Sequence, residues 1–442
     1  MAIALVYHNN PKSDCLSDLK VALFDMSHAG QESHWYALSG GRVIDSEDGQ
    51  GVVEITEPGG ASGYVGVGRN SSKYGAKPAF SHSPKLGDFV LAFDGYLKNG
   101  DVLREKYGGK NDGETVARFI ADANDFEKGV ANLAGEANGH FCLTMTTEGG
   151  EAYASRCAAG VRPLVYGEGE NGSALVTESR ALSHIGMERV RDISPGELVG
   201  IDGSGVHTIS RLEGKKNICS FLWAYYQWID CVTEGIEVDM VRSRVGAKLA
   251  QADRDSGLFV DISSPVPDSG KGYAEGYALE SGCHHSEPLI KYPYAGRSYD
   301  RPDQEKRDMI AQVKLNVVPR RARGKKMVLW DDSIRRGTQL IKPTGPIGLL
   351  KSAGAEEIHL RIGSPRNIAY CRGSPPDGDR YEDGMLAANR FPSDEEFADY
   401  LGVDSVRFIG RDDFVNAIVE GSDLSPEDLC LGCYTGEFGF LE

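Results

Sequence analysis

Short apolar runs alternate with polar, glycine-rich turns through the first half of the chain. Apolar positions at helical spacing predict helices over residues 18–27, 113–123 and 126–133. Strands and helices mixed in this way predict an α+β layered domain, which we assign to residues 1–215. The strands predicted in this domain cover residues 3–7, 63–67, 89–93, 152–155, 174–177 and 198–201.

The pattern changes after residue 215, where wholly apolar runs alternate with amphipathic segments. Runs that are apolar on both faces are typical of the buried strands of a parallel sheet. Their alternation with helices predicts an α/β domain with a doubly wound parallel sheet over residues 216–420, followed by a C-terminal segment, residues 421–442. The elements predicted here are helices over residues 239–251 and about 273–279, and strands over residues 258–262, 327–330 and 356–362.

The predicted strand over residues 327–330 runs into a cluster of polar residues. Two adjacent carboxylates end it, a loop of small residues follows, and residues 340–350 are apolar enough to form a helix. This order is typical of a phosphate-binding loop at the carboxyl edge of an α/β sheet. The alternative is a strand end with two solvated acids and a turn. The polar stretch itself reads Asp331-Asp332-Ser333-Ile334-Arg335-Arg336-Gly337-Thr338.

This stretch resembles the phosphoribosyl pyrophosphate (PRPP) motif of type I phosphoribosyltransferases, in the form found in the glutamine amidophosphoribosyltransferases of purine synthesis. The resemblance implies that Asp331 and Asp332 are catalytic residues that hold the ribose hydroxyls and lie near Mg²⁺. It also implies that residues 333–338 bind the 5′-phosphate of PRPP. Arg335 stands at a usually apolar position and Gln339 replaces a Thr, so we expect PRPP binding with somewhat altered selectivity.

A second strand–loop–helix pattern precedes the first. The predicted strand over residues 258–262 leads into the loop Ser264-Pro265-Val266-Pro267-Asp268-Ser269-Gly270. Alone, this loop is equally well explained as an ordinary turn between a strand and a helix. In the resembled family it is the pyrophosphate loop, and the resemblance therefore implies that Asp268, Ser269 and Gly270 bind the pyrophosphate of PRPP.

Residues 289–299 resemble the flexible catalytic loop of the same family. The resemblance implies a lid that brings the catalytic cations Lys291 and Arg297 over the pyrophosphate and excludes water from the ribosyl centre. Without the resemblance, the segment is an exposed basic loop. One cation of the family's Lys-Asn-Arg is lost, because Tyr292 and Pro293 follow Lys291.

Several phrases of the first domain resemble the N-terminal-nucleophile glutaminase domain of the family, which implies an αββα fold. The glutamine-hydrolysing residues are missing, however. The family's N-terminal Cys is here Ala2, the Arg of its His-Arg-Gly-Gln-Glu is Ala29, and the Asn of its oxyanion hole is Asp94, whose charge would repel an oxyanion. We expect a glutaminase fold without activity, and the alternative is an unusual nucleophile such as Cys15. The matching phrases are residues 28–32, 66–69, 91–95, 160–164, 177–179 and 194–197.

Two cysteines near the C-terminus form the sequence Cys430-Leu431-Gly432-Cys433. From spacing alone, the pair is a redox site, half of a zinc or iron–sulfur site, or a coincidence. Some members of the resembled family bind a [4Fe–4S] cluster through such a pair and two earlier cysteines. The resemblance implies that Cys219, Cys371, Cys430 and Cys433 bind this cluster, with a structural role as the default.

Charge and composition narrow the choice of partners. The formal net charge of −17 argues against nucleic acid or an anionic membrane as a partner. No apolar run is long enough for a transmembrane helix, and the start lacks the basic region of a signal peptide. Nine scattered cysteines fit a cytoplasmic protein with reduced thiols or a metal centre. The resemblance implies a homo-oligomer, either a dimer or a tetramer.

The sequence as a whole predicts a phosphoribosyltransferase that lacks glutaminase activity. In the predicted reaction, ammonia attacks C1 of Mg²⁺-bound PRPP and pyrophosphate is released. One alternative is a PRPP-dependent transferase that uses a different small nucleophile in a specialised pathway. Another is a catalytically silent paralogue that binds PRPP or a nucleotide and has a regulatory role.

Overall fold

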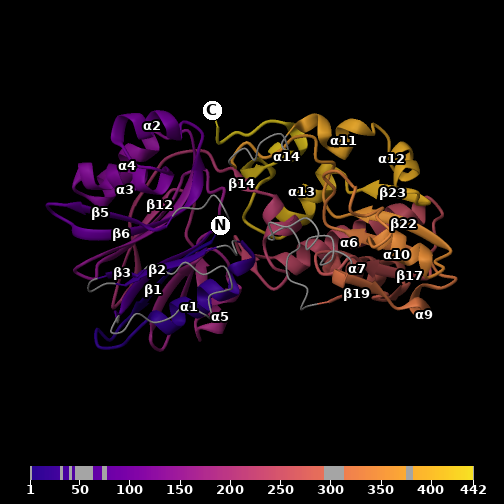
Figure 1. Ribbon diagram of the computed structural model, residues 1–442, viewed down its shortest axis with the longest axis horizontal. Helices are drawn as coiled ribbons and strands as arrows, with labels where there is room; N and C mark the ends of the chain where they lie inside the picture. The colour runs from indigo at the N-terminus through magenta and orange to yellow at the C-terminus, as the bar shows by residue number, and fades with distance from the viewer. Residues whose placement is uncertain are drawn as a thin grey trace.

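The polypeptide folds into two halves that lie side by side, with the C-terminal segment returning to the region between them (Figure 1). None of the helices in the described part of the chain is both long and apolar enough to cross a membrane. The computed structural model describes residues 2–29, 33–38, 42–44, 63–71, 77–292, 313–374 and 382–441.

The N-terminal half contains two antiparallel sheets, built from seven and six strands of the described residues. The first has the order β11 (Glu188–Asp192), β9 (Val165–Gly169), β10 (Gly172–Val176), β1 (Ala2–His8), β4 (Val65–Ser71), β2 (Ser33–Leu38) and β3 (Arg42–Ile44). The second has the order β13 (Gly205–Arg211), β12 (Glu197–Asp202), β8 (Ala152–Arg156), β7 (Gly139–Thr147), β6 (Gly87–Leu97) and β5 (Ala79–Ser83).

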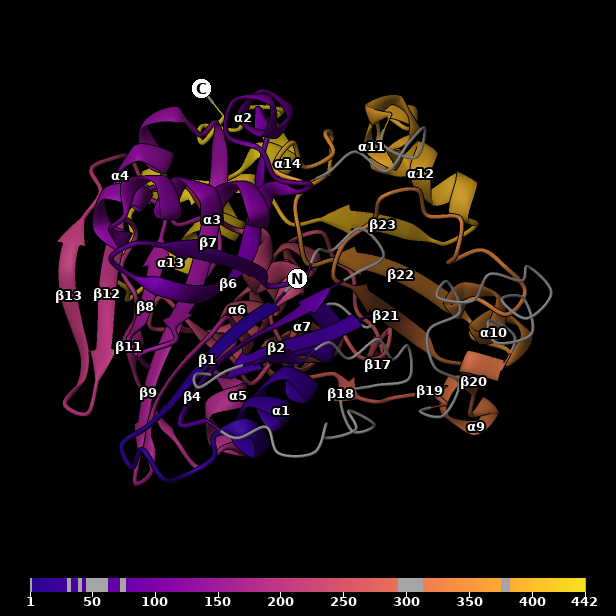
Figure 2. The ribbon, with the colours of Figure 1, turned by 60° about the vertical axis from the view of Figure 1, so that its left-hand side comes forward.

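Helices cover the outer faces of both sheets, which gives four layers (Figures 1 and 2). Strand β1 shows why, because its side chains alternate between the two faces of the sheet. Ile3 and Leu5 pack between the sheets, whereas Ala4 and Val6 pack against the helices. The predicted αββα fold is thereby confirmed. The covering helices are α1 (Leu16–Asp25) and α5 (Arg180–His184) on the first sheet, and α2 (Gly100–Tyr107), α3 (Asp112–Ala123) and α4 (Phe126–Glu136) on the second.

The C-terminal half is organised around a parallel sheet of five strands within the described residues, which confirms the predicted α/β fold. Along the chain its strands are β17 (Ile262–Pro265), β18 (His284–His285), β21 (Lys326–Asp331), β22 (Glu357–Ile362) and β23 (Ser405–Phe408). Their order in the sheet is β18-β17-β21-β22-β23, so the direction of winding reverses between β17 and β21.

Strand β21 is buried on both faces, as its unbroken apolar sequence predicts. Val328 and Trp330 pack with one set of helices, and Met327 and Leu329 pack with another. The first set comprises α6 (Val238–Asp255), α7 (Lys271–Ser281) and α13 (Arg411–Val419), and the second comprises α10 (Pro346–Ser352) and α12 (Asp394–Leu401).

Short elements complete the described structure. Among them, β14 and β24 join the start of the C-terminal half to the end of the chain as a parallel pair. The short elements are β14 (Ile218–Cys219), β15 (Val232–Thr233), β16 (Ile236–Glu237), β19 (Leu289–Lys291), β20 (Leu315–Val317), α9 (Pro319–Ala322), α11 (Ala387–Arg390), β24 (Leu429–Cys430) and α14 (Gly432–Thr435).

Two predicted boundaries were wrong. The strand predicted over residues 258–262 begins only at Ile262, because the preceding apolar residues form a connection in which Phe259 is 75% exposed. The helix predicted after the PRPP motif begins at Pro346, because residues 338–345 form turns. In both cases the composition was apolar, but tertiary contacts decided which residues joined the element.

Candidate active site

The two predicted phosphate loops meet where the strand order reverses, between β17 and β21. The backbone N–H of Val266, just after β17, donates to the carbonyl of Trp330 in β21 at 2.8 Å. Gly270 approaches this backbone so closely that a Cβ there would lie 2.5 Å from the Trp330 oxygen. Ser269 also contacts the Asp332 carboxylate through a hydrogen bond. A reversal of strand order is the usual ligand site of such sheets.

In the acidic pair at the end of β21, Asp332 is buried, and Asp331 is partly exposed to the cavity described below. Only 5% of Asp332 is exposed, and its N–H donates to the carboxylate of Asp331 at 3.1 Å. The hydroxyl of Ser333 donates to Asp332 Oδ2 at 2.5 Å. Burial, followed by the charge of Asp332, holds the pKa of Asp331 well above its ordinary value, and burial also raises the pKa of Asp332. Two carboxylates in this state favour the approach of a cation.

A cavity of about 490 Å³ opens beside this pair and is formed by the predicted PRPP loop. Gly337 turns the loop in the left-handed region, at φ +75°. The guanidinium of Arg335 lies 5.7 Å from the centre of the Tyr370 ring. Sequence reasoning missed Tyr370, because it comes from the segment after β22 and nothing in the motif points to it. The lining residues are Asp331, Ser333, Ile334, Arg335, Arg336, Gly337, Thr338, Gln339, Leu340 and Tyr370.

At the predicted pyrophosphate loop, the negative charge of Asp268 lies beside the positive charges of two lysines. Lys291, at the end of β19, donates to Asp268 Oδ2 at 2.5 Å. Lys271, the first residue of α7, lies 3.5 Å from Asp268 Oδ1. Sequence reasoning missed Lys271, although its place directly after Gly270 was a usable signal. The predicted lid residue Arg297 lies outside the described residues.

The four cysteines named above gather behind this site, where the two halves meet. Cys219 pairs with Cys430 across β14 and β24, and the Cys433 carbonyl accepts hydrogen bonds from the segment that leads to Cys371. A hydrogen bond with the Cys433 thiol, aided by the Gly373 backbone and the charge of Arg162, lowers the pKa of Cys371 to about 6. In the described residues, no three His, Cys, Asp or Glu side chains are arranged to hold a metal ion.

The residues predicted to have lost glutaminase chemistry do not lie together, because Cys15 packs with the helices on the outer face of the first sheet and Asp94 lies in β6 of the second. Asp94 is only 1% exposed, and its charge acts on both Arg69 and Arg162. Cys15 is buried at the start of α1, and burial raises the pKa of its thiol. A buried thiol that resists ionisation is a poor nucleophile. Residues 30–32 of the matching phrase lie outside the described part of the chain.

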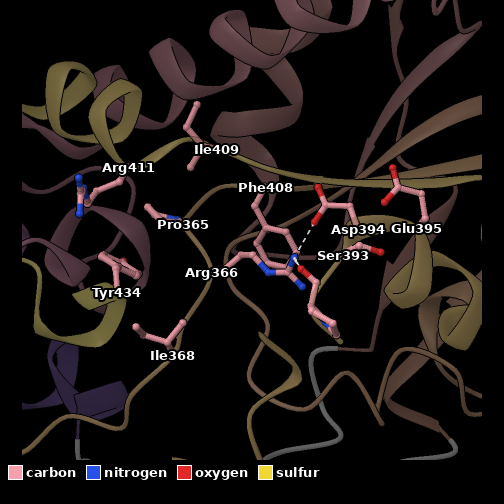
Figure 3. Close-up of a pocket in the computed structure, with 11 residues that line it drawn as sticks. Pro365, Arg366, Ile368, Ser393, Asp394, Glu395, Phe408, Ile409, Arg411 and Tyr434 are labelled. Carbon is pink, nitrogen blue, oxygen red and sulfur yellow. Dashed lines mark hydrogen bonds and ion pairs between the residues drawn. The ribbon is translucent and has the colours of Figure 1, made fainter. Parts of the chain in front are cut away.

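A second cavity, of about 600 Å³, lies at the carboxyl ends of β22 and β23 (Figure 3). Arg366 dominates one wall, where it contacts Asp394 at 3.0 Å and lies 5.1 Å from the centre of the Phe408 ring. Arg411 lies beside Asp412 at 3.4 Å. Its lining holds two arginines, Arg366 and Arg411, and two carboxylates, Asp394 and Glu395, so the formal charge of the cavity favours neither a cation nor an anion. The segment after β22 lines both cavities, with Pro365, Arg366 and Ile368 in this one and Tyr370 in the one beside the predicted PRPP loop.

The fold and the paired loops define a type I phosphoribosyltransferase joined to an N-terminal-nucleophile-type glutaminase fold. No protein-family model matches the chain. The chain belongs to the amidophosphoribosyltransferase family, whose members are phosphoribosyltransferases, and the predicted family and enzyme class are confirmed.

Curated relatives support this assignment over almost the full chain. The amidophosphoribosyltransferase of Methanocaldococcus jannaschii is 30% identical, with 94% of this chain and 93% of the relative aligned. That of Synechococcus elongatus is 32% identical, with 94% and 87% aligned. Among solved structures, the glutamine PRPP amidotransferase of B. subtilis complexed with ADP and GMP has a TM-score of 0.85 at 27% identity, with coverage of 99% and 97%.

Proposed function

We propose that this chain transfers the phosphoribosyl group of PRPP to ammonia and releases pyrophosphate, without hydrolysing glutamine itself. The main support for this proposal is that the loops after β17 and β21 meet where the order of the strands reverses. Their meeting brings Asp331 and Asp332 together with Ser269. A solved relative with a TM-score of 0.84 is described as the allosteric regulatory enzyme of purine biosynthesis. We therefore place the reaction in that pathway.

Each group around the cavity has a role in this reaction. Asp331 and Asp332 accept hydrogen bonds from the ribose hydroxyls, and the loop from Ser333 to Thr338 binds the 5′-phosphate through backbone N–H groups and hydroxyls. Nitrogen forms a bond to C1 as the bond from C1 to the pyrophosphate oxygen breaks. Lys291 and Lys271, already beside the pyrophosphate loop, offset the charge that develops on the leaving group.

The acidic pair fits a magnesium ion. Mg²⁺ is commonly held in proteins by one or two carboxylates together with substrate phosphates, so a third protein ligand is not required. The raised pKa values of Asp331 and Asp332 fit the same role, because a bound cation would stabilise both carboxylates in their ionised form. The ion supplies positive charge to the pyrophosphate when bound.

The loss of glutamine hydrolysis has two supports. Asp94 places a buried negative charge where the resembled site stabilises an oxyanion, which would oppose the reaction. Cys15, the alternative nucleophile, is buried with a raised thiol pKa, and its backbone N–H donates to the carbonyl of Gly63. Free ammonia is therefore the nitrogen source in this proposal.

The four cysteines fit the predicted [4Fe–4S] cluster. Each thiolate of such a cluster binds a different iron, so four cysteines surround a volume and need not converge on one ion. Cys219, Cys371 and Cys430 all act electrostatically on Cys433, and their segments are held together by backbone hydrogen bonds. The cluster would tie together the start, the middle and the end of the C-terminal half. Iron and sulfide analysis of the anaerobically purified protein tests this assignment.

The function is tested by measuring pyrophosphate release from PRPP and Mg²⁺ with either ammonium or glutamine as the nitrogen source. We expect release to rise with ammonium, and we expect glutamine to yield neither pyrophosphate nor glutamate. Release that requires a different amine would favour the specialised transferase. PRPP binding without turnover under any condition would favour the silent paralogue, and glutamate formed from glutamine would contradict the proposed loss.

A further inference from the structure

Arg162 lies between Asp94 and the four-cysteine cluster, which we define as Cys219, Cys371, Cys430 and Cys433. It follows Val161, whose carbonyl accepts the N–H of Cys219 at 3.4 Å. The Val161 side chain packs in a buried group with Cys430, against which Cys219 and Cys371 also pack. The backbone of Arg162 is therefore attached directly to the cluster region.

Several contacts fix the position of this arginine. Its carbonyl accepts hydrogen bonds from Arg156 Nε at 2.6 Å and from Cys142 Sγ at 3.5 Å. Its guanidinium lies 5.3 Å from the centre of the Tyr226 ring. From this place its charge acts on the thiols of Cys219 and Cys371. Arg162 is thus a partly buried cation held against two members of the four-cysteine cluster.

Asp94 lies on the other side of Arg162. In the ladder between β6 and β7, Asp94 is directly opposite Cys142, the residue whose thiol contacts the Arg162 carbonyl. The same strand, β7, reaches the cluster region through His140, whose Nε2 hydrogen-bonds the carbonyl of Gly373 at 2.9 Å. The charge of Asp94 is among those that act on Arg162. The acidic residue that removes the oxyanion hole is therefore also a counter-ion for this arginine.

We propose that Arg162 is the counter-charge of the four-cysteine cluster and that Asp94 positions it. A [4Fe–4S] cluster bound by four thiolates carries net negative charge, and burying such charge without a cation costs free energy. In this view the replacement that removes the oxyanion hole, Asp94, also stabilises the cluster, because its carboxylate holds Arg162 in place. The inference rests on the proposed cluster and assigns a role to residues outside the four ligands.

The test compares Arg162→Gln with Arg162→Lys and with Arg372→Gln, all purified without oxygen. Arg372 is a matched control, because it adjoins Cys371 in sequence but is half exposed and pairs with Asp383. Each protein is titrated with dithionite, which gives one electron to the cluster, and the reduction is followed by electron paramagnetic resonance. Because the reduced cluster carries one more negative charge, Arg162→Gln should lower the reduction potential, whereas Arg162→Lys and Arg372→Gln should stay near the unmodified protein.

The role of Asp94 is read from a double-mutant cycle. Asp94→Asn should change the potential by different amounts with Arg162 present and in the Arg162→Gln background, and equal changes would show that Asp94 does not position Arg162. If Arg162→Gln does not fold, Arg162→Met replaces it in the comparison. A potential of Arg162→Met below that of Arg162→Lys supports the counter-charge, and equal potentials in these two variants overturn it.

The failure of the cluster and the failure of this inference give different results. If the unmodified protein contains neither iron nor sulfide, the proposed cluster is wrong and the inference falls with it. If the unmodified protein holds the cluster, but Arg162→Gln has the same potential and the same rate of iron loss in air as Arg372→Gln, only the role of Arg162 is wrong.

Discussion

Asp94 in the N-terminal half and Asp332 in the C-terminal half are both almost fully buried, yet their surroundings differ. Asp94 lies between the charges of two arginines, Arg69 and Arg162, which belong to the protein itself. Burial raises the pKa of Asp332, although hydrogen bonds from Ser333 and Ser269 and the charge of Arg242 oppose this rise. Its neighbour Asp331 is a second carboxylate, whose pKa is also raised. Burial alone therefore does not identify a site, whereas two adjacent carboxylates with raised pKa values point to a bound cation.

Burial raises the thiol pKa of cysteines in both halves, including Cys219 and Cys430, and Cys371 is the exception. Burial raises the pKa of Cys15 in the N-terminal half, whereas hydrogen bonding with Cys433 lowers that of Cys371 to about 6. Only the second thiol is prepared to become a thiolate at neutral pH. Cys15 therefore stays in its neutral form, whereas the acidic pair of the C-terminal half offers negative charge that a bound cation can stabilise.

The largest effect should come from removing one member of the acidic pair. Asp332→Asn should lower ammonium-dependent pyrophosphate release by about 100-fold, because a preorganised charge at the reacting centre is lost. The rate of pyrophosphate release measures this change. Asp255→Asn, on the exposed end of α6, is the control and should retain full activity. Equal rates in the two variants would contradict a catalytic role for the pair.

A smaller loss is expected at the pyrophosphate loop. Lys291→Ala should reduce kcat/KM for PRPP by about 10-fold, equivalent to about 1.4 kcal/mol, because one of the two lysines beside Asp268 is lost. Steady-state kinetics at varied PRPP measure the effect. Lys110→Ala, an exposed position in the N-terminal half, should leave kcat/KM unchanged. Normal kinetics in the Lys291 variant would show that this residue does not stabilise the leaving group.

The pH dependence of magnesium binding should expose the raised pKa values. A raised carboxyl pKa means that the folded protein favours the protonated form, so this contribution to stability is present at low pH and is lost as pH rises through the raised pKa. Mg²⁺ binds the ionised pair and should therefore raise Tm more near neutral pH than in mild acid. Thermal unfolding with and without Mg²⁺ measures this difference, which Asp331→Asn should abolish.

The smallest expected effect lies in the N-terminal half. Cys15→Ala should change neither pyrophosphate release nor the absence of glutamate formation, because the thiol is buried and not ionised. Its measurable consequence should be a modest loss of stability, of about 1 kcal/mol, from a missing buried sulfur atom. If the unmodified protein formed glutamate and this variant did not, Cys15 would be a glutaminase nucleophile and the N-terminal half would be active.

The sequence predicted the architecture well, and it named most of the residues around the cavity. Apolar alternation in residues 3–7 specified a strand with two different faces, and the continuous apolar run of residues 327–330 specified a strand buried on both. Such patterns are local and follow directly from the repeat of the backbone. The boundaries near Phe259 and Pro346 were missed, because composition there does not reveal which residues find a packing partner.

The sequence did not predict which distant segments contact each other. The chain by itself determined the order of strands and helices, the loss of an Asn at Asp94, and the presence of four cysteines, because these are written in residue type and spacing. Only the tertiary structure decided that Tyr370 lines the same cavity as the predicted PRPP loop and that Lys271 lies beside Asp268. Electrostatic and packing partners depend on distance in space, and folding brings together residues whose separation in sequence carries no such information.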